Sequence, residues 1–220
     1  MKEDLTEIIV IMDRSGSMAS MYEHTISGFN EFLKSQQELP GEAKMTYVQF
    51  DNKYEVVHDC VDIKEIPELT GETFQPRGTT SLYDAIGKTF NTIGKRLSET
   101  PEEERPGKVI IAIMTDGGEN TSQEFKGEEG RKKIEAMIEH QDKKFNWNTM
   151  FLASGIEAQD AAISLGGASR VMCLSTSAKG MRGGYRAFGS AVNATRSGSK
   201  PMAANDPSYR GILKKNEEDE

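Results

Sequence analysis

The sequence predicts an α/β fold in which helices cover both faces of a doubly wound, mostly parallel sheet with one antiparallel edge strand. Two observations carry this prediction. Residues 8–12 and 109–114 are apolar and rich in β-branched side chains, as is typical of strands buried on both faces of a parallel sheet. Segments with a helical spacing of apolar residues alternate with such runs along the chain, which indicates strands joined by helical crossovers.

The N-terminal half is predicted to contain three strands and two helices. Apolar residues recur at helical spacings of three and four in both helices, and a Pro-Gly pair ends the first one. The second and third strands are separated only by Asp51-Asn52-Lys53, which favours a hairpin. In chain order we expect strand 7–13, a helix from residue 22 to the Pro40-Gly41 pair, strands 45–50 and 54–58, a loop over 59–80, and helix 82–97.

The C-terminal half repeats the alternation of strand and helix. We expect strand 108–115, a charged helix through residue 138, strand 147–153, helix 158–165, strand 170–174, and a glycine-rich helix over about 177–193. This order predicts one domain, residues 1–196, followed by a polar tail over residues 197–220.

Charge and hydropathy restrict the classes of protein to consider. The chain has 27 Lys and Arg against 35 Asp and Glu, which gives a net charge of −8. Its apolar runs are far shorter than the ~20 residues that cross a bilayer, and its first residues do not form an apolar leader. We therefore expect a soluble, cytoplasmic protein without a membrane partner.

Polar clusters follow two of the apolar strands and precede one helix. They are residues 13–17, residues 115–118 and residues 77–81. Because ligands of doubly wound sheets bind outside the carboxyl ends of the strands, we expect these clusters to meet at one edge. Their carboxylate and hydroxyl oxygens suit a hard divalent cation, Mg²⁺, Mn²⁺ or Ca²⁺, and argue against zinc or copper.

The same clusters resemble the metal-binding loops of one protein family. Asp13-Arg14-Ser15-Gly16-Ser17 has the Asp-x-Ser-x-Ser form that opens the metal-ion-dependent adhesion site (MIDAS) of von Willebrand factor type A (vWA) domains. Gly78-Thr79 with the segment 81–86 resembles the second loop of that family, and residues 115–118 resemble the third. The order and spacing fit over roughly residues 5–193, which implies a vWA, Rossmann-like fold.

The resemblance implies a complete MIDAS with one divalent cation, Mg²⁺ before Mn²⁺ or Ca²⁺. Ser15, Ser17 and Thr79 would bind the cation directly, and Asp13 and Asp116 would bind it directly or through water. Thr79 is preferred over Thr80 because it immediately follows Gly78, as the threonine of the family follows its glycine. An open coordination position would then accept a carboxylate from a partner protein.

The chain is more similar to the intracellular microbial vWA proteins than to the adhesive extracellular ones, because it lacks export signals. This resemblance implies an adaptor in a larger assembly, in some cases with an AAA+ ATPase. We therefore expect a non-enzymatic, metal-dependent protein-binding module whose partner offers an acidic side chain.

An enzyme is the first alternative. A strand followed by Asp also begins the haloacid-dehalogenase-type phosphatases, but those need a second carboxylate two residues later as general acid, and Ser15 occupies that position. A metal-assisted, phosphoesterase-like hydrolase with an unidentified base remains as the alternative.

A nucleic-acid-binding module is the second alternative. Six basic residues and no acidic ones lie between Asp160 and Asp206, and Lys179, Arg182 and Arg186 share one face of the last predicted helix. The acidic net charge and the lack of a recognised binding motif disfavour nucleic acid as the partner of the segment 170–200.

Overall fold

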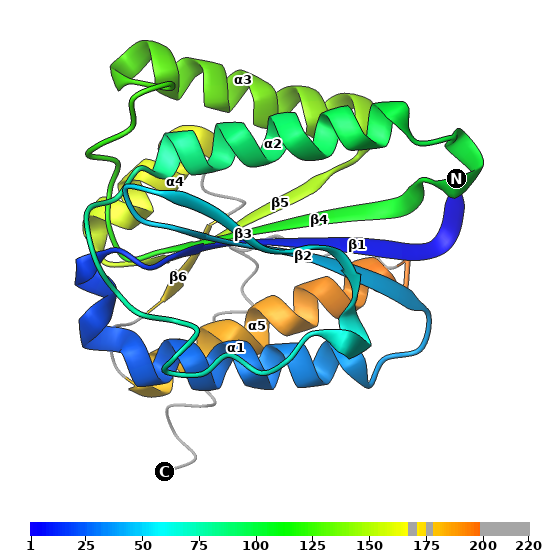
Figure 1. The fold of residues 1–220 in the computed structure, drawn as a ribbon, viewed down its shortest axis with the longest axis horizontal. Coiled ribbons are helices and arrows are strands. Elements are labelled where there is room, and N and C mark those ends of the chain that lie inside the picture. Colours follow the sequence, from blue (N-terminus) through cyan, green and yellow to red (C-terminus); the bar gives the residue numbers. More distant parts are fainter. Residues whose placement is uncertain (167–170, 175–177, 199–220) are drawn as a thin grey trace.

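The computed structural model describes residues 1–166, 171–174 and 178–198. These residues form a six-stranded sheet with helices on both faces, and the strand order is β3-β2-β1-β4-β5-β6 (Figure 1). The strands are β1 Lys2–Asp13, β2 Glu42–Phe50, β3 Tyr54–Asp62, β4 Pro106–Thr115, β5 Asn148–Ser154 and β6 Val171–Leu174.

The sheet is parallel except at one edge. β1 runs parallel to both of its neighbours, β2 and β4, and β5 and β6 continue the parallel order. Among the strands that the structure describes, only β3 pairs antiparallel, with β2. The apolar runs that predicted this sheet lie at its centre, since residues 8–12 and 110–113 are completely buried. The predicted fold class is confirmed.

Two helices cover one face of the sheet and three cover the other (Figure 1). The helices are α1 Tyr22–Gln37 and α5 Ala178–Arg196 on the first face, and α2 Leu82–Glu99, α3 Gly127–Phe145 and α4 Ile156–Gly166 on the second. Short 3-10 helices form at Gly16–Met21, Ile63–Glu65 and Glu102–Glu104. No helix in the described part of the chain has the length and apolar character needed to cross a membrane.

A glycine allows α1 and α5 to pack closely. A side chain at Gly28 would begin only 2.2 Å from the ring of Tyr185, which is itself buried between the helices. The gap left by the missing side chain is therefore filled by the tyrosine. This contact packs the glycine-rich last helix against α1.

The structure differs from the predicted element boundaries mainly at β3. The predicted strand 54–58 continues to Asp62, so part of the predicted loop 59–80 is sheet. Its register against β2 is irregular, and Cys60 adopts a left-handed conformation with φ 55°. An edge strand that is partly exposed and interrupted in this way lacks the alternation of apolar residues that marks a strand in sequence.

Other boundaries shift outward. β1 begins at Lys2, whose N–H donates to Arg105 O at 2.8 Å, and α5 continues to Arg196. Of the predicted tail, residues 199–220 lie outside the described residues, as do residue 170 of the last predicted strand and residues 175–177 around the start of the last predicted helix.

Candidate metal centre

The parallel register brings the first and third predicted loops together. β1 and β4 are neighbours, so Asp13 and Thr115 end adjacent strands at the same edge of the sheet. The Thr115 hydroxyl donates to Asp13 Oδ2 at 2.7 Å, and the Ser15 N–H donates to Asp13 Oδ1 at 2.7 Å. These bonds fix the buried Asp13 carboxylate at the base of the site.

Hydroxyl groups connect the two loops above this base. Ser15 Oγ lies 3.1 Å from Ser17 Oγ, and Ser17 Oγ donates to Asp116 Oδ1 at 2.7 Å across 99 positions of sequence. The structure thus brings together four of the five predicted metal ligands: Asp13, Ser15, Ser17 and Asp116.

The fifth predicted ligand, Thr79, does not join this group. Thr79 is exposed, and its hydroxyl lies 3.0 Å from the Thr121 hydroxyl. Thr80 is buried instead, and its Oγ1 lies beside Gly117: a side chain added there would begin 3.5 Å from Thr80 Oγ1 and 3.8 Å from Ser17 Oγ. Within the described part of the chain, Thr80 Oγ1 makes no hydrogen bond. The geometry therefore favours Thr80 over Thr79 as an oxygen donor toward the site.

Asn120, which no sequence motif predicted as a site residue, holds Thr80 in place. The Thr80 N–H donates to Asn120 Oδ1 at 3.0 Å, and Thr80 O accepts the N–H groups of Asn120 and Thr121, each at 3.1 Å. The second and third loops are therefore bound to each other through the backbone of Thr80. Their residues are 40 positions apart, so no local pattern in the sequence marks this contact.

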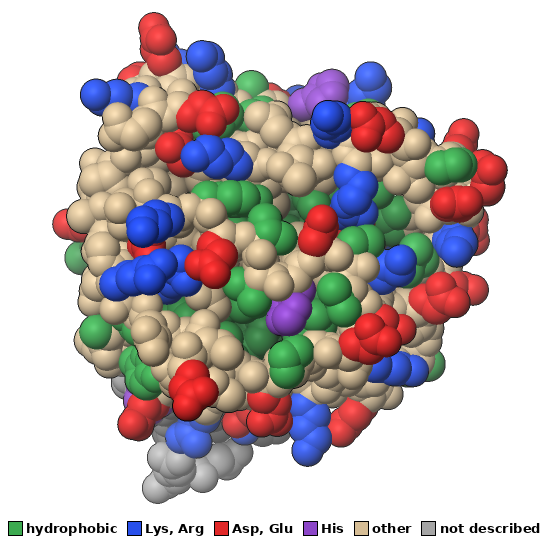
Figure 2. Space-filling model, viewed as in Figure 1, with side chains coloured by type: hydrophobic (Ala, Val, Ile, Leu, Met, Phe, Trp, Pro, Cys, Tyr) green, Lys and Arg blue, Asp and Glu red, His purple; other side chains and the backbone are tan. Residues whose placement is uncertain are grey.

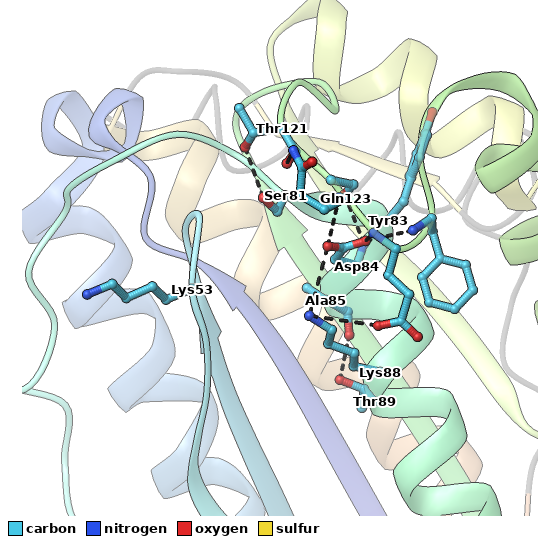
Figure 3. Close-up of polar contacts among 12 residues, drawn as sticks. Lys53, Ser81, Tyr83, Asp84, Ala85, Lys88, Thr89, Thr121 and Gln123 are labelled. Carbon is cyan, nitrogen blue, oxygen red and sulfur yellow. Dashed lines mark hydrogen bonds and ion pairs between the residues drawn. The ribbon is translucent and has the colours of Figure 1, made fainter.

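A buried carboxylate on α2 fixes the continuation of the third loop (Figure 3). Asp84 accepts the N–H groups of Gln123, Glu124 and Phe125 at 2.8–3.0 Å. In return Glu119 accepts the Tyr83 N–H at the start of α2, at 2.8 Å. This exchange satisfies orphan N–H groups of the helix start and of the loop.

Arg14, at the first of the two variable positions of the Asp-x-Ser-x-Ser loop, anchors that loop to the sheet. Its guanidinium donates to Asp51 Oδ2 at 3.1 Å, to Gln49 Oε1 at 2.9 Å and to Glu55 Oε2 at 2.7 Å. Arg77, from the second loop, also donates to Asp51 Oδ2, at 2.9 Å. The fully buried Asp51 thereby binds two of the three loops that form the site.

Burial makes the site attractive to a cation. It raises the pKa of Asp13 to about 6, in spite of the hydrogen bonds from Thr115 and Ser15 that favour the ionised form. Burial also raises the pKa of Asp116, against the hydrogen bond from Ser17. A positive charge between the two carboxylates would compensate for their lost hydration.

The donor set consists of oxygen atoms. Among the described residues, no three His, Cys, Asp or Glu side chains gather in a way that could hold a metal ion. Two carboxylates and three hydroxyls fit Mg²⁺, which commonly binds through one or two carboxylates and keeps several waters. The residues present therefore fit the cation that the sequence resemblance implies.

Comparison with known proteins places the fold. No family model matches the chain, and a search of curated proteins finds no match. Solved structures do match. A von Willebrand factor type A structure from Catenulispora acidiphila superposes with a TM-score of 0.57 at 13% identity, over 86% of this chain and 42% of that one. The chain thus has a vWA-like fold.

Two further structures have the same fold. The vWF domain of the type V pili tip protein Mfa5 from Porphyromonas gingivalis matches with a TM-score of 0.57 at 9% identity, covering 86% of this chain and 95% of that one. Proximal thread matrix protein 1 from the mussel byssus, solved with a zinc-occupied MIDAS motif, matches with a TM-score of 0.55 at 15% identity. That match covers 86% of this chain and 47% of the mussel protein, so the chain spans about half of its length.

Proposed function

We propose that the chain is a metal-dependent protein-binding module with a MIDAS at the carboxyl edge of its sheet. The observation that carries this proposal is the contact between Ser17 Oγ and Asp116 Oδ1, which brings the first and third loops to one point. Asp13 and Ser15 belong to the same group of oxygen atoms.

The proposed ligands are the hydroxyls of Ser15, Ser17 and Thr80, with Asp13 and Asp116 bound directly or through water. Thr80 replaces Thr79 in this set because its hydroxyl lies beside Gly117, as the Ser17 hydroxyl does on the same glycine. A bound cation would supply an open coordination position for an oxygen atom of a partner. The chain itself positions the donors: Thr115 orients Asp13, and Asn120 orients Thr80.

A carboxylate is the partner group that the site fits best. Two ionised carboxylates neutralise a divalent cation, so the anionic oxygen of a partner meets no net repulsion from the site. An adaptor role in a larger assembly, one with an AAA+ ATPase included, is proposed from the sequence resemblance alone. Mg²⁺ as the bound ion, a non-enzymatic role and a cytoplasmic location likewise stay predictions.

Affinity capture from the source cells tests this function. We expect a partner to be retained by the wild-type chain in Mg²⁺ and lost in EDTA. The Ser17→Ala variant should also lose that partner in Mg²⁺, whereas Ser27→Ala, which removes an exposed hydroxyl on α1, should retain it. A partner that binds equally in EDTA, or that binds Ser17→Ala like the wild type, would contradict the proposal.

A further inference from the structure

A second candidate site lies at the other end of the sheet. A groove of about 620 Å³ opens between the C-terminal ends of α2 and α3 and the start of β4. β4 leads from Gly107 in this groove to Thr115 at the metal centre, so the two sites occupy opposite ends of one strand. The ends of α2 and α3 that border the groove lie on the side of the N-terminus in Figure 1.

The inner wall of the groove is apolar and aromatic. Phe90, Val109 and Trp147 line it and are held rigidly, since each is largely buried and the rings of Phe90 and Trp147 pack 5.7 Å apart. Phe145 lies at the rim and is 52% exposed. This wall offers a preformed surface to a flat or branched apolar group.

The charged side chains that line the groove are all cations. They are Lys95, Arg105 and Lys144. The Arg105 guanidinium is held by Thr100 O at 2.8 Å and Ser98 O at 3.1 Å, and Lys144 Nζ lies 5.4 Å from the ring centre of Phe145. Among the described residues no acidic side chain lines the groove, although the chain as a whole has a charge of −8.

We propose that this groove binds a small organic anion with an aromatic or branched apolar body and a carboxylate or sulfonate head. The body would pack on Trp147 and Phe145, and the head would lie among the three cations. The volume falls within the roughly 300–1,000 Å³ that is usual for small-molecule sites. An apolar wall with a few charged groups at one side is also the usual composition of such sites.

A pair of matched dyes tests the proposal on the full chain. 8-Anilinonaphthalene-1-sulfonate has an aromatic body and an anionic head, and N-phenyl-1-naphthylamine has the same body without the charge. Trp147 is the only tryptophan of the chain and lines the groove, so energy transfer from it reports a dye bound near this residue, and the variants below assign the dye to the groove. We expect the sulfonate to bind with energy transfer, at least about five-fold more tightly than the neutral dye. Its affinity should fall as salt is added.

Two pairs of variants locate the binding. Gly94→Leu adds an apolar side chain to the lining of the groove, and the Cβ of that side chain would lie 3.7 Å from the nearest atom, Gln141 Nε2. It should abolish energy transfer, and Thr92→Leu on the exposed side of α2 should preserve it. The double variant Lys95→Gln/Lys144→Gln should lower the affinity for the sulfonate dye about five-fold and leave the affinity for the neutral dye unchanged. Lys132→Gln/Lys133→Gln, which removes two exposed charges elsewhere on α3, should weaken neither dye.

Several outcomes would overturn the proposal. Equal affinity for the two dyes would contradict the preference for an anionic ligand. Dye binding that persists in Gly94→Leu would contradict the groove as the place of binding. Binding that appears only after Tyr209, Ile212 and Leu213 are replaced by Ser would mean that the groove holds the chain's own C-terminal segment and not a small ligand. None of these outcomes depends on the metal centre, so the proposal stands or falls separately from the proposed function.

Discussion

At the scale of single residues, two neighbouring threonines differ in their position relative to the candidate metal site. Thr79 and Thr80 are adjacent in sequence, yet the Thr79 hydroxyl contacts Thr121 on the exposed side and the Thr80 hydroxyl lies beside Gly117. The positions of the two threonines after Gly78 in the sequence did not predict which hydroxyl lies toward the site. The difference follows from the backbone bonds by which Asn120 and Thr121 hold Thr80.

Exchange of each threonine for valine tests which one binds the cation. Valine keeps the shape and removes the oxygen. We expect Thr80→Val to weaken Mg²⁺ or Mn²⁺ binding roughly ten-fold or more, as loss of even a supporting group of a metal site commonly does. Thr79→Val should change affinity little in a calorimetric titration. The reverse result would restore Thr79 as the ligand.

Removal of Asp51 should destabilise the whole chain. Asp51→Ala leaves the buried Arg14 guanidinium without its buried counter-charge, which costs about 3–5 kcal/mol for such pairs. Urea unfolding at pH 7 measures this loss. Glu55→Gln removes the more exposed partner of Arg14 and should cost under about 1 kcal/mol.

The stability contributed by Asp51 should also depend on pH. Burial alone raises the pKa of Asp51, but hydrogen bonds from Arg77 and the Lys53 N–H, with the charge of Arg14, hold it below its usual value. A carboxyl with a lower pKa in the folded state stabilises the fold above its unfolded pKa, and this contribution is lost as the pH falls through the folded pKa. The difference between wild type and Asp51→Ala should therefore be constant near pH 7 and shrink below about pH 4.

At the scale of elements, two glycines on the α1–α5 interface should respond in opposite directions. Gly28→Ala places a methyl group 2.2 Å from the Tyr185 ring and should cost about 1–3 kcal/mol by overpacking. Gly189→Ala meets its nearest side-chain atoms at 3.8 Å and should stabilise α5 by up to about 1 kcal/mol. Thermal unfolding of the two variants tests the pair. Equal effects would contradict the close packing at Gly28.

The hydrogen bonds between Asp84 on α2 and the third loop give a second prediction at this scale. Asp84→Ala leaves three backbone N–H groups without their acceptor, so stability should fall by about 1–3 kcal/mol. Hydrogen exchange should rise over residues 119–125. Lys88→Met removes two long ion pairs, with Asp84 at 3.9 Å and with Glu124 at 4.0 Å, but no acceptor of a backbone N–H, so exchange in that loop should change much less than in Asp84→Ala.

The end of the edge strand β3 was predicted wrongly, and the surroundings of this strand give the reason. The strand exposes Val56 and Val57 and is interrupted at Cys60. Apolar side chains lie between acidic and basic ones on the face of the molecule drawn in Figure 2. Buried strands such as β1 and β4 are recognisable from their own residues, because their central positions, 8–12 and 109–114, are all apolar. A strand with one open edge has no such requirement, so its end depends on pairing with β2.

At the scale of the whole molecule, the sequence predicted the fold better than the details of the site. The order of strands and helices follows from local periodicity, and the carboxyl-edge rule then placed Asp13, Ser15, Ser17 and Asp116 together. No local sequence pattern predicts the contacts between the loops. Asn120 on Thr80, and Asp84 on residues 123–125, became visible only in three dimensions.

Binding of a cation should stabilise the entire fold. A ligand at about 100 times its dissociation constant adds about 2.7 kcal/mol, which corresponds to a rise in melting temperature of about 5–10 °C for a chain of this size. Mg²⁺ titrated into the chain should produce this rise, and EDTA should reverse it. Ser17→Ala should melt at the same temperature with and without Mg²⁺. An unchanged melting temperature of the wild type at saturating Mg²⁺ would contradict a site built from the folded chain.

The distance in sequence between Ser17 and Asp116 has a consequence for how the molecule folds. These two residues are 99 positions apart, and Thr115 and Asp13 are 102 apart, so the pocket for the cation exists only after β1 and β4 have paired. We expect such non-local contacts to form late, because the entropy of closing a long loop must be overcome first. Mg²⁺ should accordingly slow unfolding and leave the refolding rate almost unchanged.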